Sequence, residues 1–100
     1  MLDASPAVVP KPILLFFSSK TKGRSRRAEG YLAQVLQRRR NHDTFSIRFV
    51  AEEEHPYLIE RFRVAATPTL LVVAEAKVQG RLVDPGCCEE IQAFLAPWLR

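Results

Sequence analysis

The sequence predicts an α/β fold: a four-stranded mixed sheet with helices on both faces and its elements in the order β-α-β-α-β-β-α. Two stretches, residues 13–18 and 69–73, are continuously apolar, which is typical of strands buried between two layers. Two others, residues 25–39 and 87–98, repeat apolar residues every three or four positions, which is typical of helices with one buried face. Strands that alternate with helices indicate one sheet covered by helices.

The first half of the chain predicts a strand, a helix, a second strand and a short helix. The first strand is followed by a polar stretch and by Ser25, a suitable N-cap for the first long helix. Residues 45–49 alternate between apolar and polar side chains and predict the second strand. Pro56 suits the first turn of a short helix over residues 56–61. A strand-helix-strand unit of this kind predicts a right-handed crossover between two parallel strands.

The second half predicts an antiparallel hairpin and a closing helix. After the strand over residues 69–73, residues 75–76 form a two-residue turn into a strand over residues 77–83. The alternation of apolar and polar side chains in that strand indicates an edge or half-exposed position, and residues 84–86, Asp-Pro-Gly, end the sheet. The last helix, residues 87–98, carries one apolar stripe formed by Ile91, Phe94, Leu95 and Trp98.

Length and composition indicate one small domain. A chain of 100 residues has room for a single core, so we expect a tail over residues 1–11 and one domain over residues 12–100. The longest apolar run is far short of the roughly 20 residues that span a bilayer, and no secretory signal is visible, so we expect a cytoplasmic protein. The two cysteines, Cys87 and Cys88, are adjacent, which excludes a disulfide framework and agrees with a reducing compartment.

The net charge of +4 is unevenly distributed. Between positions 20 and 40 the only acidic residue is Glu29, and the basic residues there are Lys20, Lys22, Arg24, Arg26, Arg27, Arg38, Arg39 and Arg40. One interpretation is an ordinary solvated helix surface, and another is a surface that attracts an acidic protein partner. We expect no binding of nucleic acid, because Tyr31 is the only aromatic residue within this stretch and no nucleic-acid motif is present.

Residues 64–70, Val-Ala-Ala-Thr-Pro-Thr-Leu, resemble the proline turn before the third strand of the thioredoxin superfamily, whose core has a similar order of elements. The resemblance implies a cis bond before Pro68, which would let Thr67 offer its backbone groups to an extended peptide. The superfamily places a Cys-x-x-Cys at the start of the first long helix, where the helix dipole lowers the pKa of a thiol. Here that stretch is Lys22-Gly23-Arg24-Ser25, so we expect no thioredoxin chemistry.

Residues 55–70 also resemble a branch of this superfamily that lacks these cysteines as a rule: the clock protein KaiB and the KaiB-like sensory domain of the clock kinase SasA. The two sequences share a proline, a leucine, a glutamate and Ala-Thr-Pro-Thr-Leu at the same spacing. Residues 91–99 are also similar to the C-terminal end of the kinase sensory domain. The Gly-x-Thr-Pro of KaiB and the catalytic segments of the kinase are absent. The resemblance implies a sensory interaction module of circadian two-component signalling whose partner is an ATPase of the KaiC type.

The leading hypothesis is therefore a non-catalytic interaction domain with a thioredoxin-like fold, which is not an enzyme and needs no cofactor. Its expected partner-binding residues are Thr21, Lys22, Arg24, Ser25, Arg26, Arg27, Thr67 and Pro68. The alternative hypothesis is a divergent redox protein or redox sensor that uses Cys87 or Cys88, which we expect at the same end of the fold as the partner site. The sequence leaves the oligomeric state open.

Two other sets of polar residues are weaker candidates for a site. His42, Asp43 and His55 lack the spacing of metal ligands, so we expect no metal site. The acidic run over residues 52–54 is expected to be solvated, with pairing to the basic helix of a second copy as the alternative.

Overall fold

The elements of the fold follow the predicted order β-α-β-α-β-β-α. A computed structural model describes residues 11–99, so the predicted tail, apart from Lys11, lies outside the described residues. The elements are β1 (Ile13–Ser18), α1 (Gly23–Gln37), the 3₁₀ helix η1 (Arg38–Asp43), β2 (Ser46–Ala51), α2 (Pro56–Arg61), β3 (Thr69–Ala74), β4 (Lys77–Val83) and α3 (Cys88–Leu95). No helix within residues 11–99 has the length and apolar character needed to cross a membrane.

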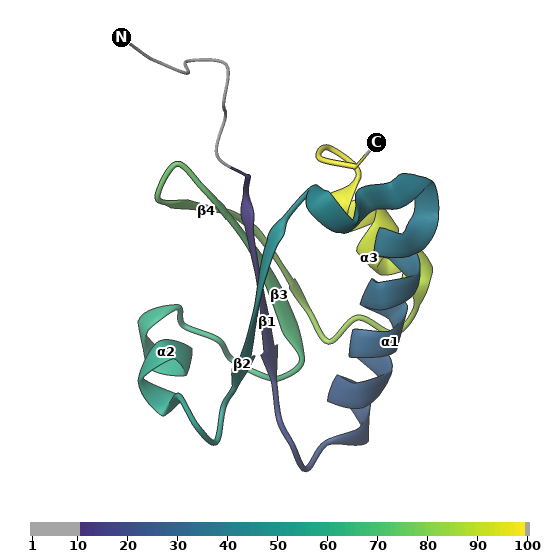
Figure 1. Cartoon of the computed structure of the whole chain (residues 1–100). Coiled ribbons are helices and arrows are strands. Elements are labelled where there is room, and N and C mark those ends of the chain that lie inside the picture. The colour runs from purple at the N-terminus through teal and green to yellow at the C-terminus, as the bar shows by residue number, and fades with distance from the viewer. Residues whose placement is uncertain (1–10, 100) are drawn as a thin grey trace, which may run out of the picture.

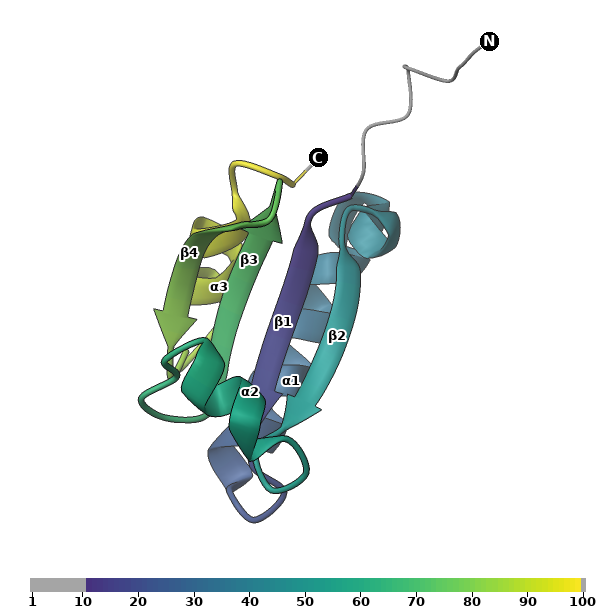
Figure 2. The same ribbon diagram turned by 90° about the vertical axis from the view of Figure 1, so that its left-hand side faces the viewer.

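The four strands form one mixed sheet in the order β2-β1-β3-β4. β1 is parallel to β2 and antiparallel to β3, and β3 is antiparallel to β4. Helices α1 and α3 cover one face of the sheet and α2 covers the other (Figures 1 and 2). The central strands are thus the two continuously apolar ones, and the predicted edge position of residues 77–83 is confirmed.

The core is divided in two by the sheet, because successive side chains of a strand point to opposite faces. On β1, Leu14 and Phe16 pack in the cluster that includes the buried residues of α1 and α3. Phe17 packs in the smaller cluster with Val50 and Leu71, against which residues of α2 pack. The β3–β4 hairpin turns at Glu75 and Ala76, both with positive φ, which fits the right-handed twist of the strands and confirms the predicted two-residue turn.

The ends of the first long helix differ from the prediction. α1 begins at Gly23, Lys22 is its N-cap without a side-chain hydrogen bond, and Ser25 is a buried residue inside the helix. The predicted capping role of Ser25 is therefore wrong, because its hydroxyl serves a tertiary contact with Ser19 instead. At the other end α1 stops at Gln37, and the last two residues of the predicted helix belong to η1.

Two further boundaries differ. β2 begins at Ser46, so Phe45 precedes it and packs in the core, while Phe49 is 60% exposed on this edge strand. α3 ends at Leu95, not at Trp98. Ala96 still has helical backbone angles, but Pro97 has no backbone N–H to continue the helical hydrogen bonds. Trp98 still packs edge-on against Phe45, with 6.4 Å between the ring centroids.

Candidate functional site

Three connecting segments meet at one end of the sheet. Because β1 and β2 are parallel, the loops that follow them begin at the same end of the sheet. β3 runs in the opposite direction, so the turn before it lies at that end too. These segments are residues 19–22, 52–54 and 65–68. The start of β1 and the C-terminal turn lie at the opposite end of the molecule (Figure 1). Sequence reasoning singled out the first and third segments and missed the second.

Two serines fix the loop between β1 and α1. The buried Ser25 hydroxyl accepts the backbone N–H of Ser19 at 3.0 Å. The Ser19 hydroxyl donates to Glu53 Oε2 at 2.6 Å. Since that hydroxyl has only one proton, the Thr21 hydroxyl is the donor in its 3.1 Å contact with Ser19 Oγ. Ser25, predicted to bind a partner, therefore faces inward and positions the loop.

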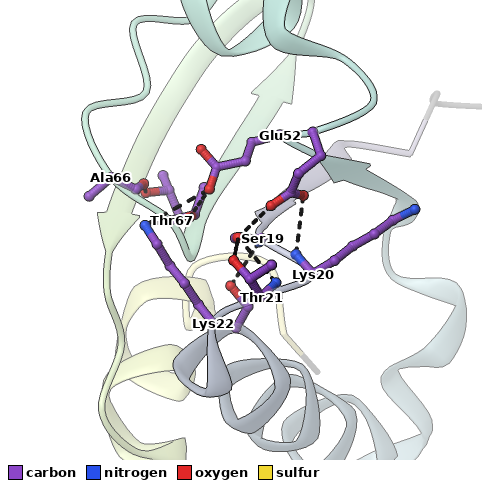
Figure 3. A network of polar contacts seen from close by, with 10 residues as sticks. Ser19, Lys20, Thr21, Lys22, Glu52, Ala66 and Thr67 are labelled. Atoms are coloured by element: carbon purple, nitrogen blue, oxygen red, sulfur yellow. Dashed lines mark hydrogen bonds and ion pairs between the residues drawn. The ribbon is translucent and has the colours of Figure 1, made fainter.

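Lys22 spans the gap between the loop and the turn before β3 (Figure 3). Its Nζ donates to Thr67 Oγ1 at 3.2 Å and lies 3.9 Å from Glu52 Oε1. Thr67 donates its own hydroxyl proton to Glu52 Oε1 at 2.9 Å. One residue from each of the three segments thus joins a single polar network.

The acidic run is exposed at Glu53 and Glu54, as expected, and it also forms contacts within the same chain that the sequence did not predict. Glu53 accepts the Ser19 hydroxyl and, at 3.1 Å, the backbone N–H of Lys20, and these hydrogen bonds hold the pKa of Glu53 below its usual value. Glu54 forms an ion pair with Lys20, which lowers the pKa of Glu54 and raises that of Lys20. These two carboxylates bind the β1–α1 loop of the same chain.

The turn before β3 is partly exposed and partly buried. The Thr67–Pro68 bond is cis, as expected, but both residues are buried, with Thr67 5% exposed. Ala65 and Ala66 are exposed. Within residues 11–99, no hydrogen bond is made by the backbone N–H groups of residues 65–67 or by the C=O groups of Ala65 and Thr67. The surface offered here is therefore the main chain around Ala66.

Asp84 is a site residue that sequence reasoning missed. Its backbone N–H donates to the carbonyl of Pro68 at 2.7 Å, and its Oδ2 accepts from Arg24 Nη1 at 2.6 Å. Asp84 therefore ties the proline turn to the first turn of α1. The only sequence signal was the Asp-Pro-Gly sequence, which indicates a turn but not which residues the turn will contact.

A shallow, open groove of about 640 Å³ runs along this end of the molecule, between the first turn of α1 and the proline turn. Its lining residues are Lys22, Gly23, Arg24, Arg27, Ala66, Thr67 and Asp84. Arg26 lies in a different hollow, beside Ser19 and Glu29. The first turn of α1 contains no acidic residue, so the positive end of the helix dipole and the cations of the groove reinforce each other.

The Cys88 thiol lies away from the groove, which corrects the expectation that it would lie at the same end of the fold as the partner site. The Cys88 thiol contacts Gln34 Oε1 at 2.9 Å. Gln34 is twelve residues beyond Lys22, or about 18 Å along the helix axis at 1.5 Å per residue. Cys87 is the N-cap of α3, and Glu90 accepts the backbone N–H of Gly86 and, at 3.8 Å, contacts the Cys87 sulfur. Both thiols are free, and neither contacts the proline turn.

No three His, Cys, Asp or Glu side chains within the described part of the chain converge as metal ligands would. The groove therefore presents main-chain groups, three cations and one carboxylate as its chemistry. Such a set can hydrogen-bond and attract a partner, and it contains no nucleophilic sulfur.

Comparison with known proteins identifies the fold. No protein-family model matches the sequence, and no curated protein is similar to it at a significant level. Among solved structures, the chain is similar to Trxlp from Edwardsiella tarda EIB202, with a TM-score of 0.76, 17% identity, and coverage of 90% of this chain and 84% of that one.

Two thioredoxins are also similar in structure. The oxidised form of mitochondrial thioredoxin 3 from Saccharomyces cerevisiae has a TM-score of 0.75 and 12% identity, with coverage of 88% of this chain and 79% of that one. Reduced desulfothioredoxin from Desulfovibrio vulgaris Hildenborough has a TM-score of 0.74 and 22% identity, with coverage of 87% and 81%. The chain therefore has a thioredoxin-like α/β fold.

Proposed function

We propose that the chain is a non-catalytic interaction domain that binds a partner protein along the groove beside Ala66. The observation that carries this proposal is the main chain of residues 65–67, which has unpaired N–H and C=O groups within the described structure. A partner can reach it because Ala65 and Ala66 are exposed. An extended segment of a partner can hydrogen-bond such groups in the manner of an added strand.

The residues at the start of α1 support binding rather than catalysis. Thiol-disulfide exchange requires a thiolate that attacks a disulfide sulfur. At the start of α1 the chain has Lys22, Gly23 and Arg24, none of which can do so, and the Ser25 hydroxyl is buried and hydrogen-bonded. The two cysteines are placed elsewhere, beside Gln34 and Glu90. We therefore propose that the protein is not an enzyme.

The partner that we propose is an ATPase of the KaiC type. This finer proposal is supported by the resemblance of residues 55–70 to the KaiB-like branch, a segment that includes α2 and the proline turn. Ala66 and Thr67 of that segment line the groove, so a partner bound there would contact this part of it. A sensory role in two-component signalling is part of the same proposal.

The test is to block the groove without changing its charge. Ala66→Tyr places a bulky neutral side chain at the exposed centre of the proposed surface, and Ala93→Tyr makes the same change at an exposed position of α3. Binding of each variant to a purified KaiC-type ATPase is measured by isothermal titration calorimetry. We expect the Ala66→Tyr variant to lose binding by about tenfold or more, because the added ring covers the unpaired main chain, and the Ala93→Tyr variant to bind as the unmodified protein does.

Two results would contradict the proposal. If both variants bound equally well, the groove would not be the docking surface. If the unmodified protein did not bind the ATPase, the KaiC-type partner would be wrong. Thermal unfolding followed by circular dichroism verifies that each variant is folded.

A further inference from the structure

The groove beside Ala66 continues along α1 toward the turn that follows β4. A second hollow of about 270 Å³ is lined by Tyr31, Pro85 and Gly86. It shares Arg24, Arg27 and Asp84 with the first hollow. Arg24, Arg27 and Asp84 therefore lie where the two adjoining hollows meet, and we refer to the two hollows together as the channel.

The charges of this channel do not balance within the described chain. Arg24 is neutralised by Asp84 at 2.6 Å, and Lys22 lies 3.9 Å from Glu52. Arg27 makes no hydrogen bond or ion pair with any of residues 11–99. The channel therefore presents one guanidinium without a carboxylate partner.

Arg27 is placed so that a ligand in the channel would meet its guanidinium. Side chains on a helix lean toward its N-terminus. A methyl group built on Gly23, one turn earlier, would lie 3.6 Å from Arg27 Nη1. The guanidinium thus extends over the first turn of α1, toward the proline turn, and Gly23 adds no side chain between it and the solvent.

We infer that the segment of the partner that docks here is acidic and places an aspartate or glutamate carboxylate on Arg27. This inference rests on the proposed function and names the chemistry of the segment. A planar guanidinium binds a carboxylate through two parallel N–H···O bonds, so Arg27 selects this group over neutral side chains. The main chain of residues 65–67 holds the segment, and Arg27 decides which segment is accepted.

The test compares two cations and two peptides. Arg27→Gln removes the unpaired guanidinium, and Arg48→Gln removes another exposed guanidinium from β2, outside the channel. Both substitutions remove one positive charge. The probes are two synthetic peptides with the same Ala-Thr-Ser background, one with glutamate at alternate positions and one with glutamine there. Binding is followed by changes in the backbone amide signals of Gly23, Arg27 and Ala66 in ¹⁵N NMR spectra.

We expect the glutamate peptide to bind and the glutamine peptide to bind much more weakly. Arg27→Gln should weaken binding of the glutamate peptide about fivefold at low salt, as for one ion pair at a partly solvated surface, and Arg48→Gln should not. Equal binding of the two peptides, or equal loss in the two variants, would overturn the inference and leave the proposed docking site standing. Tighter binding of an oligothymidylate than of the glutamate peptide would also overturn it, in favour of a nucleic-acid ligand.

Binding of the KaiC-type ATPase provides a second, independent test. If Ala66→Tyr abolishes binding of the ATPase and Arg27→Gln does not weaken it, the docking site is right and the acidic segment is wrong. If the glutamate peptide binds and the ATPase does not, the acidic specificity stands and the KaiC-type partner is wrong.

Discussion

Glu53 is the residue that ties the acidic run to the β1–α1 loop. It accepts both the hydroxyl of Ser19 and the backbone N–H of Lys20. These donors stabilise the carboxylate over the carboxylic acid, so the pKa of Glu53 in the folded protein is below its ordinary value. The loop that carries Lys22 therefore depends on the charge of Glu53.

This dependence predicts how acid acts on the Glu53→Gln variant. Because the folded protein lowers the pKa of Glu53, its contribution to stability is complete above the unfolded pKa and is lost as the pH falls through the folded pKa. The variant should be less stable than the unmodified protein near neutral pH, and the difference in urea midpoint should shrink below about pH 4. Glu60→Gln, at an exposed position of α2, is the control. Urea midpoints that stay equally far apart at every pH would contradict the assignment.

The sequence predicts the helices and strands better than it predicts the individual residues of the site. The sequence indicates that Lys22, Arg24 and the proline turn stand near the site, since both the helix start and the turn have recognisable patterns. It does not indicate Asp84 or Glu53, because their partners are far away in the chain: Arg24 is 60 residues from Asp84, and Ser19 is 34 residues from Glu53. Only the parallel pairing of β1 and β2 brings the latter pair together.

At the scale of elements, the first turn of α1 lines the groove. The middle of the same helix contains a glycine, Gly30, that has no evident structural role. A methyl group built on Gly30 would have no neighbour within 4 Å, and the φ of Gly30 is not positive. Nothing in the fold therefore requires a glycine there. The helix bears the conformational cost of glycine without a packing benefit.

Gly30→Ala should therefore stabilise the protein by about 0.5–1 kcal/mol, because alanine restricts the unfolded chain and favours the helix. The measurement is the free energy of unfolding in urea. The reverse change at an exposed position of the same helix, Ala33→Gly, is the control and should lose about as much. A Gly30→Ala variant that is less stable than the unmodified protein would contradict the open surroundings of Gly30.

The elements themselves could be predicted where the hydrophobic pattern is strong. The bounds of β1, α2 and β4 agree with the prediction, because apolar runs, Pro56 and the turn at residues 75–76 fix them locally. The bounds that failed had different causes. The Ser25 hydroxyl binds Ser19 instead of capping α1, and Pro97 ends α3 before its apolar stripe ends.

At the scale of the molecule, the thioredoxin-like fold brings the proline turn and the start of α1 together without any sulfur between them. The chain keeps main-chain groups that an extended segment can pair with, and adds cations that such a segment would have to match. The fold could be predicted from the sequence, because it follows from the order and pattern of the elements. The charge balance of the groove could not, because it depends on which carboxylates reach which cations.

The central claim is that this fold binds its partner without thiol chemistry, and the Cys87→Ser/Cys88→Ser double variant tests it most directly. Serine retains a hydroxyl that can donate to Gln34 as the Cys88 thiol does, so the fold should be preserved. We predict the same dissociation constant for the KaiC-type ATPase in the double variant and the unmodified protein. A dissociation constant raised about tenfold or more in a folded double variant would contradict the claim.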